Sequence, residues 1–172
     1  MMTIHDLREA SAEQTYDWIE HIAENLRPED LAELEATAED GLTSDLDPTV
    51  RLFASVMLSE MGWIVCVDDE PVCIFGAAPT ASEDEGIAWL MGTPAMDRRR
   101  VQIGIGRRTP HYLDILHTRW RRLFNHVDAR NQTSLVWLLR SGFVVEDVDM
   151  HHGREQRPFY LFSSNREGPT HL

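Results

Sequence analysis

The sequence predicts an α/β or α+β fold, in which a mixed β-sheet is flanked by helices. Two observations predict it. Candidate strands and helices are interleaved along the 172-residue chain instead of forming separate blocks. Within residues 127–143, a strand end, a helix cap, a short amphipathic helix, a glycine and a new strand follow one another with very short connections. With 42% hydrophobic residues, we expect a single domain over residues 1–163 and a flexible tail over 164–172.

The N-terminal segment is predicted to hold one strand and two helices. Weak alternation indicates a strand over residues 2–8. Ser11 is a suitable N-cap for a helix that runs to Leu26, and a second short helix is expected over 28–34, where a proline opens the first turn. We interpret residues 38–46 as a polar loop.

A third helix is predicted to follow Asp47 and to end at Gly62. Its apolar residues recur at helical spacing and should form one buried face. That face consists of Val50, Phe53, Ala54, Met57, Leu58 and Met61.

The middle of the chain is predicted to form three buried strands. Residues 63–67 and 72–78 are nearly continuous apolar runs around a turn, which is typical of a hairpin covered on both faces. Residues 86–92 are a further buried strand. If the hairpin is symmetric, Cys66 and Cys73 face each other across it, and in a reducing compartment both are small core residues.

The second half is predicted to begin with a basic, glycine-containing loop over residues 94–108. A helix should start at Thr109-Pro110 and end near Trp120. Asn131 can cap the next helix and Gly142 can end it. The apolar stripe of that helix is Leu135, Leu138 and Leu139. The remaining strands are expected over 123–128, 143–150 and 158–163.

Charge and composition exclude several classes of protein. The net charge of −13 argues against a general nucleic-acid binder. There is neither an apolar run long enough for a membrane span nor a secretory signal pattern, so a cytoplasmic protein is expected. The histidines and cysteines show no metal-ligand spacing, and no metal is expected.

The charge is distributed unevenly along the chain. Residues 1–50 hold 14 of the 29 acidic residues, whereas residues 98–122 hold eight arginines.

The segment 127–143 resembles the closing segment of the GCN5-related N-acetyltransferases. The matching positions are Val127, Asn131, Ser134, Leu138, Gly142 and Phe143. Every spacing agrees, but the family usually has Tyr where this chain has Leu138. The resemblance implies a mostly antiparallel central sheet of about six or seven strands with helices on both faces. It also implies acetyl-CoA or another acyl-CoA as donor, an amine acceptor and direct attack of the amine on the thioester.

The resemblance also assigns candidate donor-binding residues. In the family, a glycine-rich loop leading into a helix holds the pyrophosphate on backbone N–H groups. Residues 101–106 resemble that loop, and the alternative is a solvated basic loop or a protein-facing patch. The pantetheine arm would lie between the strand 86–92 and Asn131, which could equally be a plain helix cap. The full set is Leu90, Met91, Gly92, Arg100, Gln102, Gly104, Gly106, Arg107 and Asn131.

The catalytic groups stay unassigned. The family's usual proton donor to the leaving thiolate is the Tyr that matches Leu138, and leucine cannot donate a proton. Glu85, His126 and Tyr160 are the candidates for proton transfer. Loss of one proton donor usually costs about 10²–10⁴ in rate, which slows an enzyme without excluding one.

Short segments also resemble the acetyltransferase-like internal virion (core) proteins of short-tailed bacteriophages. They are residues 1–4, 89–93, 124–127 with Asn131, and 159–162. This second resemblance implies an alternative function: a non-catalytic virion or assembly protein, with a degenerate active site, that keeps the fold as a docking scaffold. Its partners would then be other phage proteins, and its location the host cytoplasm or the virion.

Overall fold

A computed structural model describes residues 1–37 and 47–166. Its elements are β1 (Met2–Asp6), α1 (Ala12–Glu24), α2 (Pro28–Ala36), α3 (Pro48–Leu58), β2 (Met61–Val67), β3 (Glu70–Pro79), β4 (Glu85–Gly92), the 3₁₀ helix η1 (Pro94–Asp97), α4 (Arg99–His117), β5 (Arg122–Asp128), α5 (Gln132–Arg140), β6 (Val144–His152) and β7 (Arg157–Asn165). The polar loop predicted over 38–46 lies outside the described residues. Strand β7 extends to Asn165, so Ser164 and Asn165 belong to the sheet and not to the predicted C-terminal tail.

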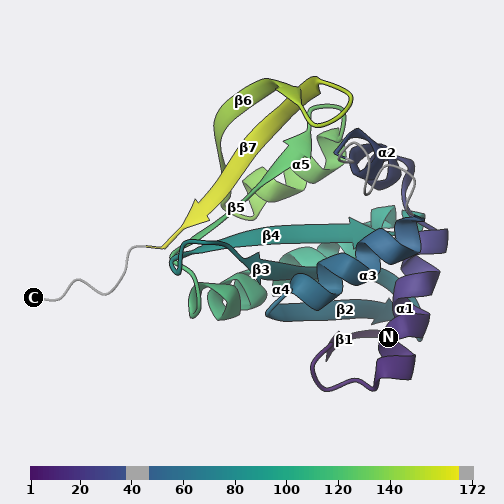
Figure 1. Cartoon of the computed structure of the whole chain (residues 1–172). Coiled ribbons are helices and arrows are strands. Elements are labelled where there is room, and N and C mark those ends of the chain that lie inside the picture. Colours follow the sequence, from purple (N-terminus) through teal and green to yellow (C-terminus); the bar gives the residue numbers. More distant parts are fainter. Residues whose placement is uncertain (38–46, 167–172) are drawn as a thin grey trace, which may run out of the picture.

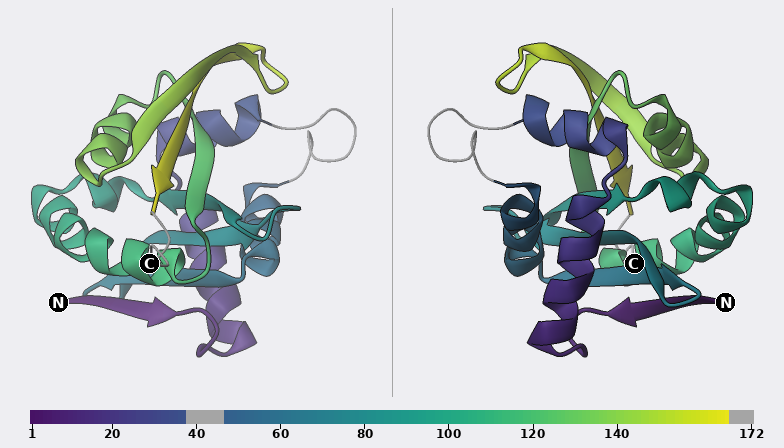
Figure 2. Two further views of the ribbon diagram at one scale, coloured as in Figure 1. Left: turned by 90° about the vertical axis from the view of Figure 1, so that its left-hand side faces the viewer. Right: turned by 90° about the vertical axis from the view of Figure 1, so that its right-hand side faces the viewer.

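The strands form one seven-stranded sheet in the order β1-β2-β3-β4-β5-β7-β6. Neighbouring strands are antiparallel except for β4 and β5, which are parallel. Helices α1 and α3 cover one face of the sheet and α4 and α5 cover the other (Figures 1 and 2). The predicted fold class, a mixed and mostly antiparallel sheet with helices on both faces, is confirmed.

Strands β4 and β5 pair over a short stretch and then separate. Their register covers Glu85–Ile87 opposite Arg122–Phe124, so the C-terminal halves of both strands have no ladder between them. At the point of separation, the side-chain amide of Asn125 donates to the carbonyl of Ala88 across 2.9 Å. The sheet therefore opens between its two parallel strands.

Helix α3 corrects the prediction for residues 47–62. The helix ends at Leu58, and Met61 and Gly62 begin β2. Most of the face predicted to be buried is exposed, with exposed fractions from 40% to 71% at Val50, Phe53, Met57 and Leu58. Leu52 is buried instead, and Val56 packs beside it against α1. On a helix rich in apolar residues, periodicity alone does not identify the packed side.

Helix α4 corrects the prediction of a loop over 94–108. The helix begins at Arg99, so residues 101–106 are helical and Pro110 lies inside the helix. The reason is burial, because Val101, Ile105, Thr109 and Leu116 form its packed side.

Pro110 is accommodated inside the helix. Proline removes one N–H and crowds the carbonyl four residues earlier, which here belongs to Gly106. A Cβ at Gly106 would have no neighbour within 4 Å. The side chains of Arg108 and Thr109 donate to the carbonyls of Gly104 and Ile105, both across 3.0 Å.

The β5–α5–β6 segment folds largely as predicted. Asn131 caps α5, since its side-chain oxygen accepts from the Ser134 N–H across 3.2 Å. Gly142 has a φ of +92°, a left-handed conformation that favours glycine. Leu135 and Leu138 are buried, but Leu139 is 54% exposed, so its predicted place in the apolar stripe is wrong.

The β2–β3 hairpin is asymmetric, so the two cysteines are not paired across it. A register shift between Val65 and Cys66 places Cys73 opposite Val65 and Cys66 opposite Pro71. Both thiols are free and buried, and they belong to different core clusters. Burial raises the pKa of the Cys73 thiol to about 12, which is consistent with a purely structural residue.

Candidate active site

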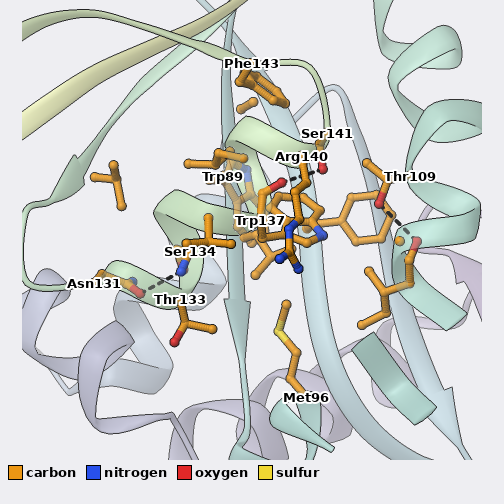
Figure 3. Close-up of a pocket in the computed structure, with 18 of the residues that line it drawn as sticks. Trp89, Met96, Thr109, Asn131, Thr133, Ser134, Trp137, Arg140, Ser141 and Phe143 are labelled. Atoms are coloured by element: carbon orange, nitrogen blue, oxygen red, sulfur yellow. Dashed lines mark hydrogen bonds between the residues drawn. The ribbon is translucent and has the colours of Figure 1, made fainter. Parts of the chain in front are cut away.

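A cleft of about 940 Å³ lies where β4 and β5 separate (Figure 3). Its walls come from α2 on one side of the sheet and from α4 and α5 on the other. It brings together six residues predicted from the sequence: Leu90, Met91, Gln102, Gly106, His126 and Asn131. Six others do not line it: Glu85, Gly92, Arg100, Gly104, Arg107 and Tyr160.

The edge of β4 that faces the cleft is partly occupied by the protein itself. The N–H of Gly92 donates to Asp30 Oδ2, and the N–H of Arg27 donates to the carbonyl of Gly92, both across 2.9 Å. Alternate residues of a strand direct their backbone groups to the same edge. The N–H and C=O of Leu90 therefore point into the cleft, between the bonded Ala88 and Gly92.

A buried ion pair forms the α2 side of the cleft. Arg27 and Asp30 are 2% and 3% exposed, and they pair bidentately, Nε to Oδ2 across 3.0 Å and Nη2 to Oδ1 across 2.9 Å. Burial disfavours the charge of Arg27, but its bonds to Asp30 and to Asp97 outweigh this and raise its pKa. Arg27 therefore stays charged, and the pair fixes the start of α2 against the end of β4.

Glu33, one helical turn beyond Asp30, is a titratable group of the cleft wall. Its carboxylate accepts from the side-chain amide of Asn131 and from the backbone N–H of Asp128, both across 3.3 Å. Burial raises its pKa to about 7, the nearby charges of Asp30 and Asp128 add to this, and the two hydrogen bonds oppose it. A carboxyl group that titrates near neutral pH in a cleft is suited to general-base chemistry.

Sequence reasoning missed Glu33. The available signal was the i, i+3 spacing of Asp30 and Glu33 on the predicted helix 28–34, which places two carboxylates on one face.

Asn131 is engaged within the protein. It is 2% exposed, its side-chain oxygen caps α5, and its amide nitrogen donates to Glu33 and, across 3.5 Å, to Asp30. The predicted cap is confirmed. The same side chain joins α5 to both carboxylates of α2.

Of the three predicted candidates for proton transfer, His126 lines the cleft. Its ring stacks on His152 with centroids 4.3 Å apart. Burial, and then the charge of His152, lowers its pKa. Glu85 instead pairs with Arg122 across 2.8 Å at the other end of β4. Tyr160 packs against the core cluster on the α5 side of the sheet.

The first turn of α4 borders the cleft through Arg99 and Gln102. The N–H groups of Val101 and Gln102 donate to the carbonyl of Arg98, so those of Arg99 and Arg100 precede the helical ladder. Within residues 1–37 and 47–166, none of Arg98, Arg99 and Arg100 forms a salt bridge. A helix start with exposed arginines is suited to an anion.

The predicted glycine loop is part of the body of α4. Gly106 lines the cleft, whereas Gly104 packs against Met2, where a Cβ would lie 2.7 Å from Cε. Gly104 therefore permits the close approach of Met2 to α4, and Gly106 lies in the turn of α4 that contains Pro110. Neither glycine forms a loop ahead of the helix.

Neither a metal site nor a membrane-spanning helix is found in the described part of the chain. It contains no group of three or more His, Cys, Asp and Glu side chains that could hold a metal ion. Over the same residues, no helix is both long and apolar enough to cross a membrane.

Comparison with solved structures identifies the fold. No family profile and no curated protein matches the sequence. The ribosomal-protein-S18-alanine N-acetyltransferase of Escherichia coli is 14% identical over 100% of this chain and 99% of that one, with a TM-score of 0.64. A GNAT-family acetyltransferase of Bacillus anthracis is 11% identical over 95% and 94% of the two chains, with a TM-score of 0.64. A spermidine N-acetyltransferase of Vibrio cholerae is 12% identical over 95% and 93%, with a TM-score of 0.61. The chain thus has the fold of the GCN5-related N-acetyltransferases.

Proposed function

We propose that this protein is an acyl-CoA-dependent N-acyltransferase. The cleft between β4 and β5 would take the thioester donor from the side of α4 and α5, and the amine acceptor from the side of α2. One observation carries the proposal: a cleft passes between the two parallel strands of an acetyltransferase-type sheet, and the pKa of a carboxyl group in its wall, Glu33, is raised to about 7. Solved enzymes with this fold include acetyltransferases of a ribosomal protein and of spermidine.

Donor binding would use backbone groups at two places. The pyrophosphate would accept from the N–H groups of Arg99 and Arg100 at the start of α4, where the helix dipole favours an anion. Gln102 and Gly106 continue the same wall, and Arg100 and Arg107 add positive charge on the exposed side of the helix. The amides of the pantetheine arm would pair with Leu90, next to Met91.

Gly92 is given a different role from the one expected. Its N–H and C=O are bonded to Asp30 and Arg27, so it holds α2 in place rather than the donor. Asn131 likewise acts through Glu33 and Asp30, as a positioning residue of the acceptor side.

The proposed reaction is direct transfer. Glu33, directly or through one water, takes a proton from the acceptor ammonium, and the amine nitrogen attacks the thioester carbonyl. The C–N bond forms, the C–S bond breaks, and the thiolate leaves. The nitrogen gives a second proton to water as the amide forms, and water supplies a proton to the thiolate, because Leu138 cannot. The products are an amide and coenzyme A.

A second candidate function is the non-catalytic scaffold, a phage virion or assembly protein. The observation that favours it is the amount of apolar surface left exposed on two elements. Phe53 and Met57 of α3 are 40% and 67% exposed, and Val148 and Met150 of β6 are 41% and 56% exposed. Such surfaces are typical of protein contacts. Purified virions that lack this polypeptide would contradict a structural role in the particle.

A thiol-release assay tests the enzymatic proposal. Acetyl-CoA is offered with a panel of amines that includes N-terminal peptides and polyamines. We expect release of coenzyme A that depends on one acceptor class and that falls in a Glu33→Gln variant. Absence of thiol release, together with absence of acyl-CoA binding by calorimetry, would overturn the proposal.

A further inference from the structure

Part of the cleft wall, between α4 and α5, is apolar, and we call the space beside it the apolar branch. Four of the residues that line it are nearly fully buried: Leu116 (3% exposed), Leu138 (7%), Phe143 (4%) and Phe162 (7%). They come from α4, from α5 and the residue just before β6, and from β7. Leu113 and Trp137 complete the wall.

Two hydroxyl side chains at the margin of this branch bond within their own helices. Thr109 donates to the carbonyl of Ile105 across 3.0 Å, and Ser141 donates to the carbonyl of Trp137 across 2.8 Å (Figure 3). With both hydroxyl protons engaged in this way, the remaining wall is mainly aliphatic and aromatic surface. Two polar groups are left: the indole N–H of Trp137, which is buried without a hydrogen-bond partner among the described residues, and the exposed side chain of Arg140. An apolar occupant is therefore favoured over a polar one.

We propose that this branch binds the acyl chain of the donor, so that the preferred thioester carries an aliphatic chain longer than acetyl. The inference rests on the proposed function. It follows from the continuity of one cleft, in which the donor edge at Leu90 and the branch at Leu116 and Phe143 form a single cavity.

Other parts of the two substrates fit the branch less well. The phosphates need N–H groups and positive charge, which lie at Arg99, roughly 25 Å along α4 from Leu116 at 1.5 Å per residue. The acceptor would arrive beside Glu33, on the α2 side of the sheet. Leu138 also gains a role here, because it extends the aliphatic wall.

A measurable dependence on chain length follows. Each methylene moved from water into an apolar site contributes about 0.8 kcal/mol, which is roughly a fourfold gain in affinity. Dissociation constants should therefore fall roughly fourfold for each added methylene, until the branch is full.

Calorimetric titration of the full chain with acetyl-, butyryl-, hexanoyl- and octanoyl-CoA tests this, and it needs no acceptor. We expect affinity to rise along the series. Equal affinities for all four thioesters would overturn the acyl-chain proposal and leave the proposed function intact. If none of the four binds, the proposed function fails as well.

Two neighbouring residues of α5 provide a matched pair of variants. Leu138→Phe narrows the branch and should bring the ratio of octanoyl-CoA to acetyl-CoA affinity close to one. Leu139→Phe makes the same change on the exposed side of the helix and should keep the wild-type ratio. If thermal melting shows that Leu138→Phe does not fold, Leu113→Phe narrows the same branch from α4. An unchanged ratio in the narrowed variant would contradict the proposal.

Discussion

The side-chain amide of Asn131 donates to the carboxylate of Glu33 across 3.3 Å, and this joins the cap of α5 to the α2 side of the cleft. The bond favours the ionised carboxylate, whereas burial favours the neutral acid. The balance leaves the pKa of Glu33 at about 7. A side chain placed by helix capping thus also sets the state of the proposed base.

Replacing Glu33 by Gln should reduce kcat/KM for acyl transfer by about 10²–10⁴ at neutral pH, because the amine would lose its proton acceptor. Donor affinity should be unchanged, since Glu33 lies on the α2 side of the cleft, where we propose that the acceptor binds. Steady-state kinetics and calorimetry measure the two quantities. Glu35→Gln is the matched control, because Glu35 is exposed on the same helix. Equal rates for the two variants would remove Glu33 from the mechanism.

The rate should also depend on pH through Glu33. Since the base must be ionised, kcat/KM should rise with pH up to about 7 and then level off. Asn131→Ala removes a hydrogen bond that favours the carboxylate, so its limb should move to higher pH. A pH–rate profile of the wild-type protein and the Asn131→Ala variant checks this. A limb in the same place for both proteins would contradict the assignment.

The free energy of unfolding should also depend on pH through Glu33. The folded protein holds the Glu33 proton more tightly than the unfolded chain, in which the pKa is 4.5. This contribution to the free energy of unfolding is complete below pH 4.5. It is lost as the pH rises from 4.5 through about 7, a difference of about 3 kcal/mol. Urea unfolding of the wild-type protein and the Glu33→Gln variant across this range measures it. His126 titrates in both proteins, so its contribution cancels when their free energies of unfolding are compared. If the free energies of unfolding of the two proteins change with pH in parallel, the raised pKa of Glu33 is refuted.

Arg27→Met should destabilise the fold by about 3–5 kcal/mol, because Asp30 would stay buried without its cation. Arg8→Met breaks another Arg–Asp pair, but the side chain of Arg8 is 55% exposed, so its loss should cost about 0–1 kcal/mol. Denaturant midpoints at one pH compare the two variants. If both lose the same small amount, the Arg27–Asp30 pair does not hold α2 to the end of β4.

Pro110→Ala should stabilise the protein by about 1–3 kcal/mol, because alanine restores an N–H toward the carbonyl of Gly106 within α4. Pro48→Ala is the control. Pro48 opens α3, where proline is favoured, so that change should give no gain. Thermal melting of both variants checks this. Destabilisation by Pro110→Ala would indicate that the helix is interrupted at residue 110.

The sheet and α5 could be predicted because their signals are local. The cap at Asn131, the stop at Gly142 and the apolar runs of β2, β3 and β4 are written in short segments. Helix α4 could not be predicted, because a proline such as Pro110 usually marks the start or end of a helix. In the structure, the burial of Val101 and Ile105 outweighs that local preference. Glu33, the candidate base, was equally hard to predict, because its hydrogen-bond partners lie far from it in the sequence.

The environment of Glu33 comes from residues far along the chain. Its hydrogen bonds reach Asp128 and Asn131, which lie 95 and 98 positions away. The i, i+3 spacing of Asp30 and Glu33 places two carboxylates on one helix face, but no pattern within that segment encodes the partners at Asp128 and Asn131. Strand β4 could be predicted as a segment, but the hydrogen bonds of Gly92 to Arg27 and Asp30 depend on how α2 packs against that strand.

The most direct test of the central claim is a titration with coenzyme A that is followed through the backbone amide resonances of the protein. A donor site in the cleft predicts saturable shifts that are largest at Leu90 on β4 and at Arg99 and Arg100 on α4. The Gly92 amide, already bonded to Asp30, should shift less. Absence of saturable shifts at millimolar coenzyme A, or shifts confined to α3 and β6, would contradict the account.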